Sequence, residues 1–365
     1  MDFPLASMTP RRLTGKQSLN SLYKQVASKV ISESLRIGKG ETVTVETWNN
    51  GVDFARQLLI EARRIGSIPL MLLEDEEAYV QGVPVTPDDI RGSMGKHEYS
   101  LLSATDAYVF IPGPPAGGFT KKLSGKNYTE SVRYNSSWYE TAGKAKLRGV
   151  RLTFGYVGSY LSGMLDKSAK DIVDFQLRAS LVDFKKVKSR ASKLAGYLQD
   201  GAEARLTSGK SKLTFHLKGE VEIQDGVIDK ADVSAGNNMS YVPPGFVTKE
   251  IDSSSVSGAV TISPSVTRLG MINDAAFNIE RGRIKKYVSR SSTPTLEAVQ
   301  DIVRKTAVKV SYLTVGLNPL MRYGYAQDRF VEGALCLNLG FNAIIGDGDL
   351  TIDGERIVHN GKLTV

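Results

Sequence analysis

The sequence predicts an α/β protein in two parts: an N-terminal α/β domain with a mainly parallel sheet, and a C-terminal α+β domain rich in antiparallel strands. Two observations support this prediction. In the first third of the chain, apolar runs of strand length alternate with a segment of helical period. After residue 205 the apolar period becomes two, and glycines recur at the spacing of short strands. We place the boundary near residue 200, which gives domains of residues 1–200 and 201–365.

The strands and the helix of the first part follow one another directly. Thr42–Glu46 alternates polar and apolar residues, and residues 52–65 place apolar residues at helical spacing before the stop signal Gly66. Ile68–Leu73 is almost entirely apolar, which suits a buried parallel strand, and residues 107–111 form another strand. Strand, helix and strand in this order predict a parallel sheet with right-handed crossovers.

The rest of the chain changes from helical to antiparallel patterns. Residues 165–200 carry an apolar stripe of helical period, whereas residues 212–218 alternate strictly. A further helix is expected over residues 294–307. Asp353-Gly354 and Asn360-Gly361 are strong hairpin signals near the end of the chain.

Composition excludes several classes of protein. A hydrophobic fraction of 41% among 365 residues can form a full core, and a single cysteine excludes both an intramolecular disulfide framework and a cysteine-cluster zinc site. No apolar run approaches the roughly 18 residues of a membrane span, and the N-terminus lacks a signal-peptide pattern. We therefore expect a cytoplasmic protein without a membrane segment. The net charge of +8 comes from interrupted basic clusters, so nucleic-acid binding rests on charge alone.

No local motif specifies an activity. The phosphate loop, the nucleophile elbow, the H-E-x-x-H helix and the C-x-x-C pair are all absent. His216 falls on the polar face of an alternating strand, His359 precedes a turn, and His97 falls in a polar segment typical of a loop. The three histidines are far apart in sequence, so no two of them have metal-ligand spacing. Cys336 lies in an apolar strand without a histidine nearby in sequence, which favours a buried inert thiol.

Several segments, in matching order, resemble the thermophilic metallo-aminopeptidases of the aminopeptidase T and S type, a leucyl aminopeptidase-like family. Residues 31–80 resemble the start of that family, with a Lys-Gly-Glu turn before the first strand. Residues 241–260 match, without a gap, a segment of the form N-x-P-x-G-E-V-F-x-x-P followed by V-x-G. Residues 315–319, 328–340 and 350–362 match the end. The iron-dependent dihydroxypyridine dioxygenases are distantly similar to the same C-terminal pattern. The resemblance implies an aminopeptidase T-like fold and a homodimer.

The resemblance also implies where metal ligands would stand. Members of that family hold two metal ions with two Glu, two His and one Asp. The first Glu position falls on Phe246, the second on Tyr312 and the first His on Cys336, while an assisting tyrosine falls on Ala343. The last two ligands, an H-x-D pair, have no counterpart after Gly346. A metal pair needs anionic and imidazole ligands, so the resemblance implies that the metal-ligand positions are lost and that no cofactor is bound.

Three functions remain open, and the sequence does not decide whether the protein is an enzyme. The first is an aminopeptidase T-like binding or scaffold protein without the two-metal site, which takes a peptide or a small molecule. The alternative is an active aminopeptidase that uses zinc, cobalt or manganese to release N-terminal amino acids. The third is a repurposed metal-free cleft in which Tyr312 and Cys336 perform acid–base or covalent chemistry. Its candidate residues are Tyr312, Cys336, Asn338, Asp347 and Asp349, and an ordinary packed interior is the simpler interpretation of them. Asp347 and Asp349 alternate with glycine as in a tight turn.

Overall fold

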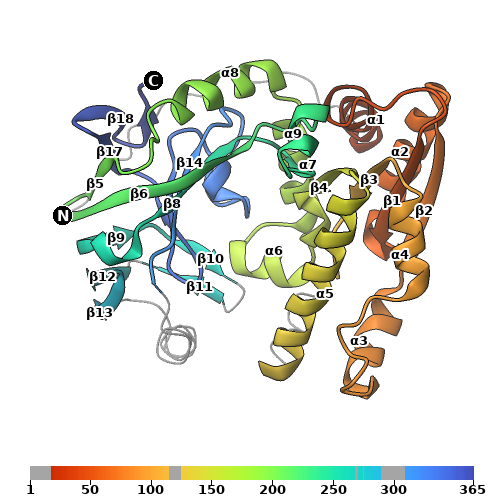
Figure 1. The fold of residues 1–365 in the computed structure, drawn as a ribbon, viewed down its shortest axis with the longest axis horizontal. Helices are drawn as coiled ribbons and strands as arrows, with labels where there is room; N and C mark the ends of the chain where they lie inside the picture. Colours follow the sequence, from red (N-terminus) through yellow and green to blue (C-terminus); the bar gives the residue numbers. More distant parts are fainter. Residues whose placement is uncertain (1–17, 115–124, 268–269, 274, 289–308) are drawn as a thin grey trace.

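The chain forms two halves that lie side by side (Figure 1). The computed structural model describes residues 18–114, 125–267, 270–273, 275–288 and 309–365, except the side chains of residues 125–132 and 267. The helix expected over residues 294–307 lies outside these residues. We call the two parts the parallel-sheet half and the antiparallel half, after their sheets. The predicted fold class, a mixed α/β protein with a parallel sheet and a large antiparallel sheet, is confirmed.

The parallel-sheet half is built on five strands. In spatial order the strands are β2 (Ile68–Glu74), β1 (Thr42–Trp48), β3 (Ala107–Phe110), β4 (Arg148–Leu152) and β7 (Met239–Val242). All four neighbouring pairs are parallel. Their carboxyl ends therefore lie along one edge of the sheet, where folds of this class bind ligands.

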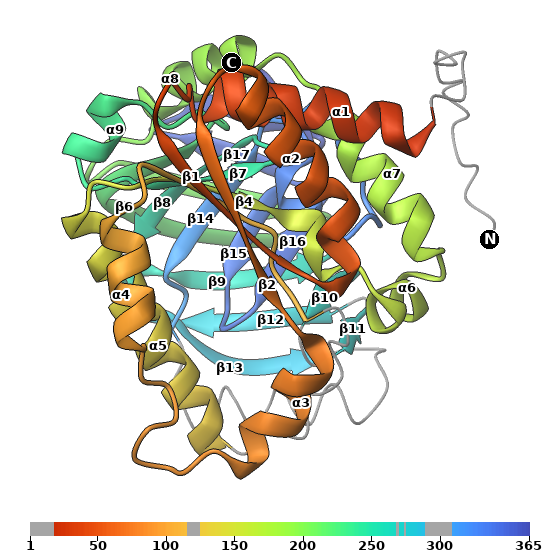
Figure 2. The ribbon, with the colours of Figure 1, turned by 90° about the vertical axis from the view of Figure 1, so that its right-hand side faces the viewer.

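Helices cover both faces of this sheet, so the half has three layers (Figure 2). One face packs on helices α1 (Leu19–Lys29), α2 (Val52–Arg64) and α7 (Ala169–Ala179). The other face packs on α4 (Lys96–Ser103) and α5 (Gly125–Lys144). Helix α3 (Glu76–Val85) follows β2 in the chain, and α6 (Ser159–Leu165) follows β4. The predicted helix at residues 52–65 is confirmed as α2, and Gly66 follows it with φ of +82°.

The antiparallel half contains a twelve-stranded sheet and a two-stranded ribbon. The main path runs β16 (Asn342–Ile345), β15 (Leu335–Asn338), β14 (Tyr312–Gly316), β8 (Phe246–Ile251), β6 (Ser211–Gln224), β5 (Glu203–Ser208), β17 (Asp349–Ile352), β18 (Glu355–His359) and β19 (Lys362–Leu363). The strands β9 (Ser257–Ile262), β12 (Ala275–Glu280) and β13 (Arg283–Val288) branch from β6. The ribbon consists of β10 (Ser265–Thr267) and β11 (Gly270–Ile272). Both predicted hairpin turns occur here, with Asp353 and Asn360 each at φ of 48°.

Helices and one strand join the two halves. Helix α8 (Phe184–Ala195) packs Ala191 and Leu194 on the antiparallel sheet. Helix α9 (Lys230–Ser234) precedes β7, which completes the parallel sheet although it follows residue 200 in sequence. The predicted boundary near residue 200 therefore stays a prediction, although β7 lies after it in sequence and belongs to the sheet of the first half.

Two local expectations are wrong. Strand β2 is parallel, as predicted, but it is the edge strand rather than a buried one, with Ile68 63% and Leu70 54% exposed. His97 is the second residue of α4 and not part of a loop. Within the described part of the chain, no helix combines the length and apolar character needed to cross a bilayer.

Candidate functional site

Three residues that the resemblance places at metal-ligand positions share one face of the antiparallel sheet. Strands β8, β14 and β15 are neighbours, with Phe246 opposite Gly316, Tyr312 opposite Glu250, and Cys336 opposite Thr314. Side chains two residues apart on a strand point to the same side, so Phe246, Tyr312 and Cys336 lie on one face. The alternate residues of these strands point into the core of the half.

Phe246 is part of an aromatic cluster. Its side chain is 3% exposed, and its ring centroid lies 4.8 Å from that of Phe330 and 5.7 Å from that of Tyr241. The guanidinium of Arg329 lies over the ring, with Cζ 4.7 Å from its centroid. The position that the resemblance assigns to a glutamate is therefore filled by hydrocarbon and covered by a cation, which would repel a metal ion.

Tyr312 and Cys336 differ strongly in exposure. Tyr312, at the start of β14, is 45% exposed, whereas Cys336 is 2% exposed. Burial raises the pKa of the Cys336 thiol to about 12, so the sulfur is protonated at neutral pH. The expected burial of Cys336 is confirmed, and its lack of reactivity stays a prediction. Between the two residues, the hydroxyls of Thr248 and Thr314 are hydrogen-bonded to each other at 2.9 Å.

The other three candidate residues divide between the same face and a neighbouring turn. Asn338 lies two residues beyond Cys336 on β15, and its Oδ1 accepts a hydrogen bond from Gly340 N at 3.0 Å. Asp347 is exposed in the turn after β16, where Ser208 donates to it at 3.3 Å. Asp349 lies on β17. The structure thus brings Tyr312, Cys336 and Asn338 onto one face, whereas Asp347 lies in the turn between β16 and β17 and Asp349 begins β17.

Asp349 stabilises a hairpin. It accepts a hydrogen bond from the backbone N–H of Asn360 at 2.6 Å and contacts Nδ1 of His359 at 2.9 Å. The bond from Asn360, together with that from His359, lowers the pKa of Asp349. These contacts agree with the expected turn chemistry of His359. His216 is exposed on β6, as expected.

The residues at these positions do not fit a pair of metal ions. Phe246 has no ligand atom, the Cys336 thiol is protonated, and Ala343 contributes only a methyl group to the core beside Leu337. Across the residues that the structure describes, no group of three or more His, Cys, Asp or Glu side chains is arranged to hold a metal ion. The side chains at these positions can therefore neither hold two cations nor lower the pKa of a water between them.

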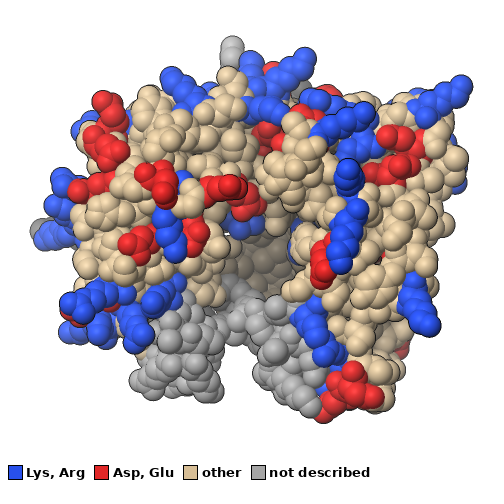
Figure 3. All heavy atoms as spheres, viewed as in Figure 1, with Lys and Arg blue, Asp and Glu red and all other residues tan. Residues whose placement is uncertain are grey.

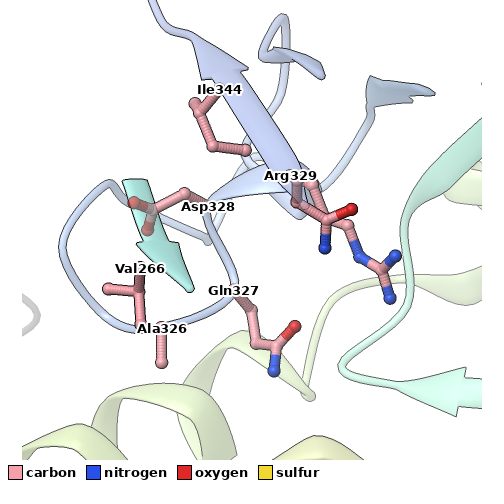
Figure 4. A pocket seen from close by; sticks show the side chains of 7 residues that line it. Val266, Ala326, Gln327, Asp328, Arg329 and Ile344 are labelled. Atoms are coloured by element: carbon pink, nitrogen blue, oxygen red, sulfur yellow. The ribbon is translucent and has the colours of Figure 1, made fainter. Parts of the chain in front are cut away.

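A pocket that the sequence did not indicate lies beside this face. Its volume is about 220 Å³, and its lining consists of Val266, Ala326, Gln327, Asp328, Arg329, Asn342 and Ile344 (Figure 4). The side chains of Asp328 and Arg329 point in different directions from the short helix η6 (Asp328–Phe330). Burial raises the pKa of Asp328 to about 6, although Gly324 N donates to its Oδ1 at 2.9 Å. The pocket thus offers one carboxyl group, one guanidinium and two amides.

The pocket lies where the two halves meet. Val266 and Ala326 pack against the core of the parallel-sheet half. Helix α7 contacts the same region, because Gln176 donates to the carbonyl of Tyr325 at 2.8 Å and Phe175 stacks on the Tyr325 ring at 3.9 Å. Figure 3 shows the molecule hollowed between the two halves, and we call this hollow the cleft.

Solved structures with the same fold include two enzymes. The chain superimposes on wild-type aminopeptidase T from Thermus thermophilus with a TM-score of 0.68 at 14% identity, covering 95% of this chain and 100% of that one. It superimposes on 2,5-dihydroxypyridine dioxygenase from Pseudomonas putida KT2440 with a TM-score of 0.63 at 13% identity, covering 96% and 99%. No protein-family model and no curated protein matches the sequence. The comparisons establish an aminopeptidase T-like fold.

Proposed function

We propose that this chain is an aminopeptidase T-like protein without the two-metal site, and that it binds a peptide or a small molecule in the cleft between its halves. The observation that carries the proposal is the environment of Phe246. A buried ring lies where the resemblance expects a glutamate, and the cation of Arg329 covers it. Restoring a metal at this place would require both a new ligand and the removal of a stacked guanidinium.

The second supporting observation concerns Cys336. A metal-bound cysteine must be a thiolate, but burial holds the Cys336 pKa near 12. The same protonation disfavours covalent chemistry at this sulfur. Tyr312 is accessible, and its cross-strand neighbour Glu250 is ion-paired with Lys218 at 3.0 Å. Binding is therefore better supported than a metal-free reaction.

Metal content and peptidase activity test this proposal together. The purified protein, supplied in turn with zinc, cobalt and manganese, is dialysed, analysed for bound metal and assayed with a chromogenic amino-acid amide. Aminopeptidase T from Thermus thermophilus serves as the positive control. We expect less than one tightly bound ion per chain and no turnover above background. Two ions per chain with release of the amino acid would overturn the proposal.

A further inference from the structure

Aromatic rings surround Arg151 near the carboxyl edge of the parallel sheet. Arg151 is the fourth of the five residues of β4, and its Cζ lies 5.3 Å from the ring centroids of both Phe110 and Tyr156. Its guanidinium donates a hydrogen bond to the Tyr156 hydroxyl and is also hydrogen-bonded to Tyr139. Arginine has five N–H donors, so these two bonds leave donors for a ligand.

Arg329 comes from the antiparallel half and is surrounded in the same way. Its Cζ lies 4.7 Å from the ring centroid of Phe246, 5.3 Å from that of Phe330 and 5.7 Å from that of Tyr241. All three distances lie within the range of favourable cation–π contacts. Among the described residues, none accepts a hydrogen bond from the N–H groups of the Arg329 guanidinium. A partly buried guanidinium with unused donors is a binding group for an anion.

Tyr241 connects the two arginines. Arg329 lies over its ring, and Arg151 interacts electrostatically with its hydroxyl. Tyr139 and Tyr156 complete the surroundings and are 41% and 39% exposed. The rings near the two cations are therefore partly open to solvent.

Neither arginine is paired with an acidic side chain among the described residues. In the described part of the chain, neither Arg151 nor Arg329 forms an ion pair with a carboxylate. Glu46 interacts electrostatically with Arg151, but its carboxyl group is hydrogen-bonded to Tyr108. Asp328 points away from Arg329 (Figure 4). Lys167 lies 5.1 Å from the ring centroid of Tyr325 and interacts electrostatically with Asp328.

We propose that the cleft binds a small aromatic carboxylate, held at its anionic group by Arg151 and Arg329 and at its ring by the aromatic side chains around Tyr241. This inference rests on the proposed function, because it names the ligand class of the same cleft. A carboxylate is planar and accepts two parallel hydrogen bonds from a guanidinium fork. A flat ring gains contact with the tyrosines that an aliphatic ligand of the same charge would not.

Calorimetric titration with sodium benzoate tests this inference on the whole protein. Three further ligands separate the contributions: benzamide lacks the charge, cyclohexanecarboxylate lacks the flat ring, and inorganic phosphate is a non-planar anion. We expect benzoate to bind and each of the other three to bind at least tenfold more weakly. No binding of benzoate, or tighter binding of phosphate, would overturn the ligand class.

Variants test the two arginines. Arg151→Gln and Arg329→Gln should each weaken benzoate binding at least tenfold, which corresponds to about 1.4 kcal/mol. Arg205→Gln, on β5 in the antiparallel sheet, is the matched control and should bind like the wild type. If Arg151→Gln does not fold, Arg151→Lys keeps the charge but loses the planar fork, and it should show the same weakening. Unchanged affinity in folded variants of either arginine would refute the site. Such a failure leaves the outcome of the metal assay unaffected, so the two proposals fail separately.

Discussion

The guanidinium of Arg329 lies over the ring of Phe246, with 4.7 Å between Cζ and the ring centroid. The two residues come from different elements, β8 and the helix η6, and they meet on the face that also carries Tyr312 and Cys336. The contact stabilises both groups, because the cation is attracted to the electron-rich ring that it covers. This arrangement underlies our proposal that the cleft binds an anion and not a pair of metal ions.

Phe246 should be important for stability. Replacing Phe246 with alanine removes a buried ring from contact with Phe330 and Tyr241, and core Phe→Ala changes typically cost about 3–5 kcal/mol. We expect a loss in this range in the free energy of unfolding, measured by denaturant titration. Tyr312→Ala is the control, because Tyr312 shares the sheet face but is 45% exposed, so it should cost less than about 1 kcal/mol. Equal losses would show that Phe246 is not packed as described.

The fold could be predicted from sequence where local patterns were decisive. The helix at residues 52–64 has a clear 3.6-residue period, and the Asp353-Gly354 turn requires positive φ, which both residues adopt. The expected burial of β2 was wrong although a signal against it was present. Pro69 lacks an N–H, so a strand that contains it is favoured at the edge of a sheet.

The two arginines that we propose as binding groups were not predictable in the same way. Arg151 and Arg329 are 178 positions apart in sequence, and neither belongs to a recognisable motif. The two arginines come near each other only through the tertiary structure, in which β7 joins the parallel sheet and β8 of the antiparallel sheet follows it closely in sequence. Phe246 was identified through the resemblance, but its aromatic partners depend on tertiary packing.

Glu46 should make the stability of the protein depend on pH. Burial raises the pKa of Glu46 from 4.5 to about 7, and Tyr108 donates a hydrogen bond to it. The folded state therefore holds a proton between these pH values that the unfolded state has released, so stability is present at low pH and is lost as pH rises through about 7. The loss amounts to at most about 3 kcal/mol.

Replacement of Glu46 by glutamine isolates this effect, because glutamine does not titrate. Denaturant unfolding between pH 5 and pH 8 should show that the wild type loses stability relative to Glu46→Gln as pH rises. Most of this loss should occur below about pH 7, between the pKa of Glu46 in the unfolded state and its pKa in the folded state. Glu203→Gln, at an exposed position on β5, should follow the wild type. Parallel curves for the wild type and Glu46→Gln would mean that Glu46 is ionised in the folded protein throughout.

Cys336 should be unreactive in the folded protein. The chain contains one cysteine, and burial raises the pKa of its thiol to about 12. Because the thiolate is the reactive form, Ellman's reagent should give no fast reaction under native conditions and one thiol per chain in denaturant. Cys336→Ala should leave benzoate affinity unchanged. A thiol that reacts within seconds in the native state would revive the interpretation of Cys336 as a nucleophile.

Strand β2 offers a surface for the homodimer that the family resemblance implies. It is the edge strand of the parallel sheet, and Ile68, Leu70 and Leu73 are each 48–63% exposed along it. Proteins rarely leave an apolar edge strand uncovered, because its free N–H and C=O groups can pair with another chain. We therefore expect a dimer in which two β2 strands meet.

Sedimentation equilibrium tests the β2 interface directly. Leu70→Lys places a charge beside Ile68 on the exposed edge strand, where burying it without a partner would cost far more than the contact contributes. This variant should sediment as a monomer of 39.7 kDa at concentrations where the wild type is dimeric. Val85→Lys is the matched control, since Val85 is 79% exposed but lies in α3 rather than on the strand, and it should leave the dimer intact. A wild type that remains monomeric at every soluble concentration, or a Leu70→Lys variant that remains dimeric, would exclude β2 as the interface.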